Sequence, residues 1–151
     1  MNSRFLRRAY HWLAVSGLIV KDDDPLEVRD PDRAWGARSG DLMLSAKAKG
    51  RRVSVVIKNA GTAEIRERIP GWLFFYRLDI SGAPRLSTFG RHALDGERNV
   101  RRTELVLAPG RAIETEIPVD ALYDLGRTPH RVTASCEVGG TRLVSNEVVI
   151  D

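Results

Sequence analysis

Short apolar runs with a period of two begin at Leu42 and continue to the end of the chain. Leu42, Leu44 and Ala46 alternate with more polar residues, and Val53 and Val55 repeat the pattern a few positions later. Successive side chains of a β-strand point to opposite faces, so alternation of this kind buries one face of a strand. Gly, Pro and Asn separate the runs at intervals of about eight to twelve residues, which is typical of an all-β antiparallel fold.

These runs predict an antiparallel β-sandwich of about seven to nine strands. The expected strands are residues 42–47, 53–58, 64–69, 72–80, 85–89, 100–107 and 112–119, followed by the two arms of a terminal hairpin. That hairpin turns at Gly139 and Gly140. A turn or helical turn is expected at residues 120–125, and a loop at residues 90–99.

Residues 1–20 have a different pattern, which predicts a short amphipathic helix. Phe5, Ala9, Trp12, Leu13 and Ser16 fall on one helical stripe, and arginines flank it. The alternatives are a targeting or anchoring segment, because three arginines precede the apolar run, and an artefact of cloning. The apolar run is too short to span a bilayer, and any membrane contact is expected through this segment. Residues 21–41, rich in Asp, Pro and Gly, predict a linker to the sandwich domain at 42–151.

The charge pattern disfavours nucleic acid as a partner. The chain carries 24 Lys and Arg against 20 Asp and Glu, and the two signs are interspersed along the sequence. A nucleic-acid footprint gathers its basic residues on one face, whereas mixed signs favour an ordinary solvated surface. We expect a cytoplasmic protein, with the cell envelope or secretion as the alternative if residues 1–20 are a targeting segment. The oligomeric state stays open.

Cys136 is the only cysteine in the sequence, so no disulfide can form within these residues. It belongs to the alternating run Val132, Ala134, Cys136 and Val138, which places it on the apolar face of a strand. A reactive thiol needs a positive and partly exposed environment. The pattern therefore predicts a buried, inert thiol.

The C-terminal half resembles bacterial immunoglobulin-like modules. The strings LAPGRAIETEIPV, LYDLGRTPHRVTASCEV and RLVSNEVVI are similar to the non-catalytic sandwich modules attached to some secreted metalloproteases, and VSVVIKNAGTAEI resembles an early strand of intracellular proteinase-inhibitor-type sandwiches. The resemblance covers residues 42–151 and implies a fold more than a function. His130 stands where those modules usually have an aromatic residue, and Tyr123 is expected to pack in its place.

The motifs of known enzyme classes are missing from the sequence. His11, His92 and His130 do not stand at metal-ligand spacing, and no nucleophile-elbow, phosphate-loop or dinucleotide motif occurs. Glu114 and Glu116 alternate with apolar residues and are expected on the solvated face of a strand. We therefore expect a protein that is not an enzyme and has no cofactor and no metal.

The stretch PGWLFFYRLDISG predicts a surface for a protein partner. As a strand, it has one wholly apolar phase for the core and places Leu73 and Phe75 on the opposite face. The expected core residues are Leu44, Val53, Val55, Ile57, Trp72, Phe74, Tyr76, Leu78, Leu105, Ile117, Val132 and Ala134. Two large apolar groups on a solvent face indicate either a cover, from residues 1–20 or the 90–99 loop, or a binding patch.

Arginines surround this stretch in the sequence. An aromatic centre rimmed by Arg is typical of a protein-binding hot spot. The candidate partner-binding residues are Leu73, Phe75, Arg77, Arg91 and Arg101. The first hypothesis is a non-catalytic protein-binding module that uses this aromatic and arginine surface. The alternatives are an inhibitor of a protease or toxin that inserts the 90–99 loop, and a hydrolase of unrecognised type.

Overall fold

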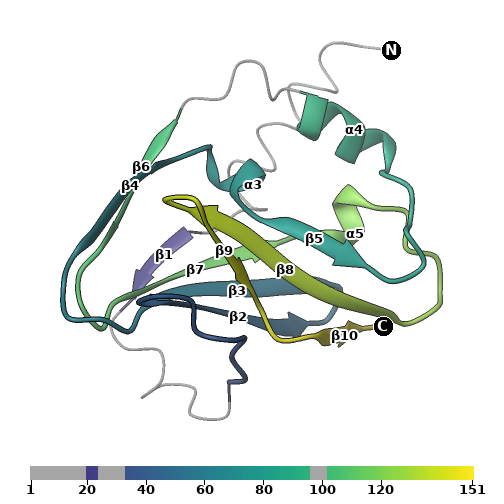
Figure 1. Cartoon of the computed structure of the whole chain (residues 1–151). Coiled ribbons are helices and arrows are strands. Elements are labelled where there is room, and N and C mark those ends of the chain that lie inside the picture. Colours follow the sequence, from purple (N-terminus) through teal and green to yellow (C-terminus); the bar gives the residue numbers. More distant parts are fainter. Residues whose placement is uncertain (1–19, 24–32, 96–101) are drawn as a thin grey trace.

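The computed structural model describes residues 20–23, 33–95 and 102–151. Over these residues the chain is mostly β-strand, the helices are short, and every strand pairing is antiparallel. Figure 1 shows two sheets stacked on each other, with the helices gathered on one side of the molecule. The prediction of an all-β, antiparallel chain is confirmed.

The first sheet has the strand order β1-β7-β3-β2. Its strands are β1 (Val20–Asp23), β7 (Ala112–Ile117), β3 (Arg52–Asn59) and β2 (Leu42–Lys49). The alternation seen in the sequence sets the register, because Val55 pairs with Ala46 on one side and with Thr115 on the other, and all three are buried. One face of this sheet therefore supplies a floor of branched apolar residues to the core.

The second sheet is built around the long strand β8 (His130–Val138). β5 (Arg77–Ile80) pairs with one edge of β8, while β9 (Thr141–Val144) and β10 (Val148–Ile150) pair with its other edge. The predicted hairpin turn is confirmed: Gly139 and Gly140 join β8 to β9 with φ values of 56° and 78°. Both residues are in the left-handed region that a two-residue turn of this type needs and that glycine adopts without strain.

A two-stranded ribbon, β4 (Ile65–Ile69) with β6 (Thr103–Leu107), extends the pairing of β3 with β7 beyond a bend (Figure 1). Asn59 holds the bend: its backbone N–H donates to the carbonyl of Arg111 at 3.0 Å, and its side-chain amide donates to the carbonyls of Ala63 and Leu107. Ile69, Leu105 and Leu107 are buried, so the ribbon closes one end of the core.

One core joins both sheets and the ribbon. The predicted core residues that are buried are Leu44, Val53, Val55, Ile57, Tyr76, Leu105, Ile117, Val132 and Ala134. Trp72 and Leu78 are half-buried against this core. Cys136 is buried with 4% exposure, as expected from its place in the alternation.

The predicted strand at residues 72–80 is wrong in its first half. Trp72–Phe75 form the helical turn α3, in which the backbone N–H groups of Phe74 and Phe75 donate to the carbonyl of Gly71. A helical turn rotates successive side chains by about 100° rather than 180°, so the expected phase is reversed. Phe75 is buried with 4% exposure, and Phe74 is only half-buried.

Aromatic contacts fix this turn against the core. The rings of Trp72 and Phe75 meet edge to face at 5.4 Å, and those of Phe75 and Tyr76 lie 4.8 Å apart. Such geometry is favourable for aromatic rings beyond the area that they bury. Tyr76 follows with extended backbone and leads into β5.

The predicted strand at 85–89 and loop at 90–99 are also corrected. Residues Thr88–Asp95 form helix α4, and only Leu86 pairs as a single β-bridge, with Tyr123. The Ser87 hydroxyl accepts from the N–H of Gly90 and donates to the carbonyl of Ala121, which ties α4 to α5 (Val119–Leu122). The helical turn expected near residues 120–125 is thus present as α5.

Part of the predicted linker belongs to the folded domain. Residues 20–23 form β1 on the edge of the first sheet, and Arg33 is buried on the outer face of that sheet. The backbone N–H of Gly36 donates to the carbonyl of Leu44 at 2.8 Å, so the segment also pairs with the edge of β2. The helix expected at residues 1–20 lies, apart from Val20, outside the described residues.

Asn146 connects the two sheets. The pairing register of β9 and β10 with β8 shifts by one residue between Val144 and Val148, which is a β-bulge. Within this bulge the Asn146 amide accepts from the N–H of Ala46 and donates to its carbonyl, both at 2.9 Å. The side chain therefore pairs with the outer edge of β2, beside the Gly36 contact, as a neighbouring strand would.

Replacing Phe75 by Ala should lower the free energy of unfolding by about 3–5 kcal/mol, because the ring is buried in the core. Phe74→Ala, at the half-buried neighbour, should cost about 1 kcal/mol. Urea denaturation of both variants measures the difference. A larger loss for Phe74 than for Phe75 would mean that the strand alternation, and not α3, describes this stretch.

Asn146→Ala should lower the free energy of unfolding by about 1–3 kcal/mol, since it leaves the buried backbone N–H of Ala46 without its partner. Glu147→Ala, at the next residue, is the matched control. The Glu147 carboxylate is exposed and lies 4.0 Å from Arg131, so the free energy of unfolding should change by less than about 0.5 kcal/mol. Equal effects of the two substitutions would show that the Asn146 link does not hold the sheets together.

Candidate functional site

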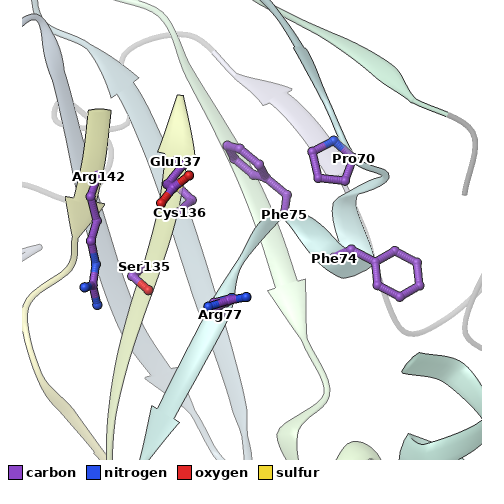
Figure 2. A pocket seen from close by; sticks show the side chains of 8 residues that line it. All are labelled: Pro70, Phe74, Phe75, Arg77, Ser135, Cys136, Glu137 and Arg142. Atoms are coloured by element: carbon purple, nitrogen blue, oxygen red, sulfur yellow. The ribbon is translucent and has the colours of Figure 1, made fainter. Parts of the chain in front are cut away.

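A cavity of about 450 Å³ opens between α3 and the end of β8 that leads to the hairpin turn (Figure 2). This volume lies in the range of sites that take a small ligand or a few side chains. Its lining residues come from the end of β4, α3, the start of β5, and β8 and β9: Pro70, Phe74, Phe75, Arg77, Ser135, Cys136, Glu137 and Arg142.

The cavity exists because β5 is shorter than β8. Arg77, the first residue of β5, pairs with Ser135, whereas β8 continues to Val138. Beyond Arg77 the position of a further β5 residue is empty, because Phe75 belongs to the α3 turn and not to the strand. The departure of the chain at α3 therefore opens a gap in the second sheet beside Glu137.

The floor of the cavity is apolar. Phe75 and Cys136 are each 4% exposed and form its base, and Pro70 closes one side. Burial raises the pKa of the Cys136 thiol to about 12, so the group stays protonated at neutral pH. The predicted inert thiol is consistent with this environment.

The mouth of the cavity carries charge. Arg77, Glu137 and Arg142 lie on the outer face of the second sheet, on three adjacent strands (Figure 2). Within the described residues none of these three side chains makes a hydrogen bond or an ion pair. Glu137 and Arg142 stand directly opposite each other in the register, so their charges offset in part, and Arg77 has no such neighbour on β8.

The predicted partner-binding residues divide into three groups. Arg77 and Phe75 both line the cavity, although Phe75 does so as buried floor and not as the exposed patch that was predicted. Arg91 is exposed on α4 and is not among the lining residues. The side chain of Leu73 and all of Arg101 lie outside the described residues.

Sequence reasoning missed Glu137 and Arg142. The signal was present, because a two-residue turn at Gly139 and Gly140 places residues 137 and 142 opposite each other on one face. The turn alone does not predict a cavity, because the cavity depends on where β5 begins.

The prediction that Glu114 is solvated is wrong. Glu114 is buried on the outer face of the first sheet, where Arg33 covers it. Ser54 donates to Glu114 at 2.5 Å, Lys49 donates to it at 3.2 Å, and Arg33 donates to Ser54 at 2.7 Å. Burial alone would raise the pKa of Glu114, but these hydrogen bonds and cations outweigh it and the pKa lies below its ordinary value.

This network is a structural ion cluster. Lys49 also donates to Glu116 at 3.0 Å, so the carboxylates and cations of the cluster are mutually paired. Because the folded pKa of Glu114 is lowered, its contribution to stability is present at neutral pH and is lost as the pH falls through the acid range.

His130 has structural surroundings. Both ring nitrogens of the buried His130 lie at hydrogen-bonding distance from carbonyl oxygens, Nδ1 from Ser81 at 2.8 Å and Nε2 from Leu125 at 2.6 Å. Tyr123 packs partly buried against the same core. Among the residues that the structure describes, no three His, Cys, Asp or Glu side chains gather as a metal site would require.

No protein-family model matches the chain, and no similar sequence is found among curated proteins. In the part of the chain that the structure describes, no helix has the length and apolar character to cross a membrane.

Proposed function

We propose that this protein is a non-catalytic module that binds another protein through the cavity between α3 and β8. The observation that carries this proposal is the composition of the cavity: an apolar floor under arginines that have no partner among the described residues. Binding hot spots combine a desolvated aromatic or aliphatic centre with Arg at the rim. The cavity has both parts within one concave surface.

We also propose that the domain is an immunoglobulin-like β-sandwich. Two antiparallel sheets share one core, and a β-ribbon continues from one of them. The hairpin near the C-terminus and the Asn146 link to β2 support this assignment. Modules of this architecture commonly serve recognition, although the architecture alone does not specify a function.

The inhibitor alternative has lost its main support. It required an extended loop at residues 90–99, and residues up to Asp95 are helical. The backbone N–H and C=O groups of a helix bond to each other, so a helix cannot pair with a protease cleft as an extended segment does. No observation favours a hydrolase.

Affinity capture from cells of the source organism, quantified by mass spectrometry, tests the binding proposal. The double variant Arg77→Glu/Arg142→Glu should recover any specific partner in an amount at least about tenfold lower than the unmodified chain does. The reason is that truncating or reversing a hot-spot charge costs about 2 kcal/mol or more of binding free energy. Both arginines line the cavity mouth and make no hydrogen bond or ion pair with a described residue, so the core should stay folded. Glu at position 142 places two like charges opposite each other at Glu137, and urea denaturation should show a loss of no more than about 1 kcal/mol from that pair.

Arg127→Glu is the matched control, because Arg127 is exposed in the turn before β8 and lies outside the cavity. It should recover the same proteins as the unmodified chain. Equal recovery by the unmodified chain, the control and the double variant would refute the cavity as the binding surface.

A further inference from the structure

The backbone of Glu137 faces the gap beside β8. In an antiparallel pair, successive residues direct their N–H and C=O groups alternately toward one neighbour and then the other. The residues that close a two-residue turn, Val138 and Thr141, bond to each other, and Ser145 donates to the carbonyl of Ala134 in the same phase. Glu137 and Ser135 therefore direct their backbone groups away from β9.

Only one of these two residues has a neighbour to receive its bonds. Ser135 pairs with Arg77 of β5. Glu137 lies two residues beyond, where α3 has replaced the strand, and among the described residues its backbone has no pairing partner on this side. The exposed Glu137 therefore presents a donor and an acceptor in the arrangement that an added strand uses.

A strand added beside Glu137 would be collinear with β5, and the start of β5 would block one of its ends. Arg77 and the preceding Tyr76 occupy that line and prevent the added segment from continuing. An extended segment can fill such a space only if its chain ends there or turns away. A chain that ends there brings its terminal carboxylate to the first residue of β5.

The charges at the closed end suit a carboxylate. Arg77 is the cation at that position, and on β8 it faces Ser135 rather than an acid. Asp79 lies on the same face two residues along β5, but no ion pair joins it to Arg77 within 4.0 Å. Glu137 disfavours an acidic side chain directly beside it and is opposed by Arg142, which leaves Arg77 as the anion partner.

We infer that the cavity takes the extended C-terminal segment of a partner protein, added as a short strand beside Glu137. Its terminal carboxylate pairs with Arg77. Its last residue stands opposite Glu137 and shares the outer face with it, so the apolar side chain of the residue before the last turns to the inner face, toward the floor at Phe75. The inference rests on the proposed binding function and deepens it by naming the part of the partner that is recognised. Main-chain bonds supply affinity and the apolar floor supplies selectivity.

The test uses acetylated hexapeptides of varied sequence with a free carboxylate and with Val, Leu, Ile or Phe as the residue before the last. Peptides selected from this pool on the full chain are then measured by calorimetry beside their C-terminal amides. Amidation and Arg77→Gln should each raise Kd about tenfold or more, because a charge-assisted bond is lost. Methylation of the peptide nitrogen that pairs with Glu137 should weaken binding similarly, and Arg127→Glu should leave it unchanged.

The outcomes separate this inference from the binding proposal. Loss of a natural partner in the arginine double variant, with no peptide of the pool bound, overturns C-terminal recognition and leaves the binding surface standing. Peptides that bind equally as acids and amides overturn the carboxylate contact. Binding that is weakened by amidation, by Arg77→Gln and by methylation of the pairing nitrogen supports the added strand as stated.

Discussion

The turn at Trp72–Phe75 decides the shape of the second sheet. Had the chain stayed extended from Ile69, β5 would have run beside the whole of β8, and the sheet would have been closed. Instead, Gly71 accepts two backbone hydrogen bonds and the chain coils, with Phe75 packed edge to face on Trp72 and against Tyr76. The packing of these three aromatic rings against one core, two of them buried, stabilises a helical turn that is too short to persist alone. The gap beside Glu137 is its consequence.

Hydrogen bonds of two asparagine side chains keep the walls of the cavity in place. The bulge at Ser145 lets Asn146 reach the edge of β2, so β8 and β9 are fixed to the first sheet. The Asn59 side chain fixes the bend that brings β4 and Pro70 to the other side of the cavity. Each wall of the cavity is thus anchored by a polar side chain bonded to backbone, a contact that loses its geometry if either sheet shifts.

Local alternation predicted the strands well. β3, β7 and β8 lie where their period of two placed them. Only β8 alternates between buried and more exposed residues along its length, whereas β3 and β7 are buried on both faces. The helices were missed for tertiary reasons. WLFF has the composition of a strand, and α4 contains Gly90, which sequence rules assign to a loop. A Cβ at Gly90 would lie 2.0 Å from the carbonyl oxygen of Leu122, so this glycine serves a close approach of two helices. Likewise Glu114 gave no sign that Arg33 would cover it.

Amide hydrogen exchange at Glu137, followed residue by residue by NMR, tests the central claim most directly. The ladder assigns the N–H of Ser135 to β5 and that of Cys136 to β9, and it leaves the N–H of Glu137 facing the gap. The Glu137 amide should therefore exchange at least about tenfold faster than those of Ser135 and Cys136, since an unbonded amide needs no opening of the structure. Protection of Glu137 equal to that of its two neighbours would show that the sheet is closed at this point and would contradict the account.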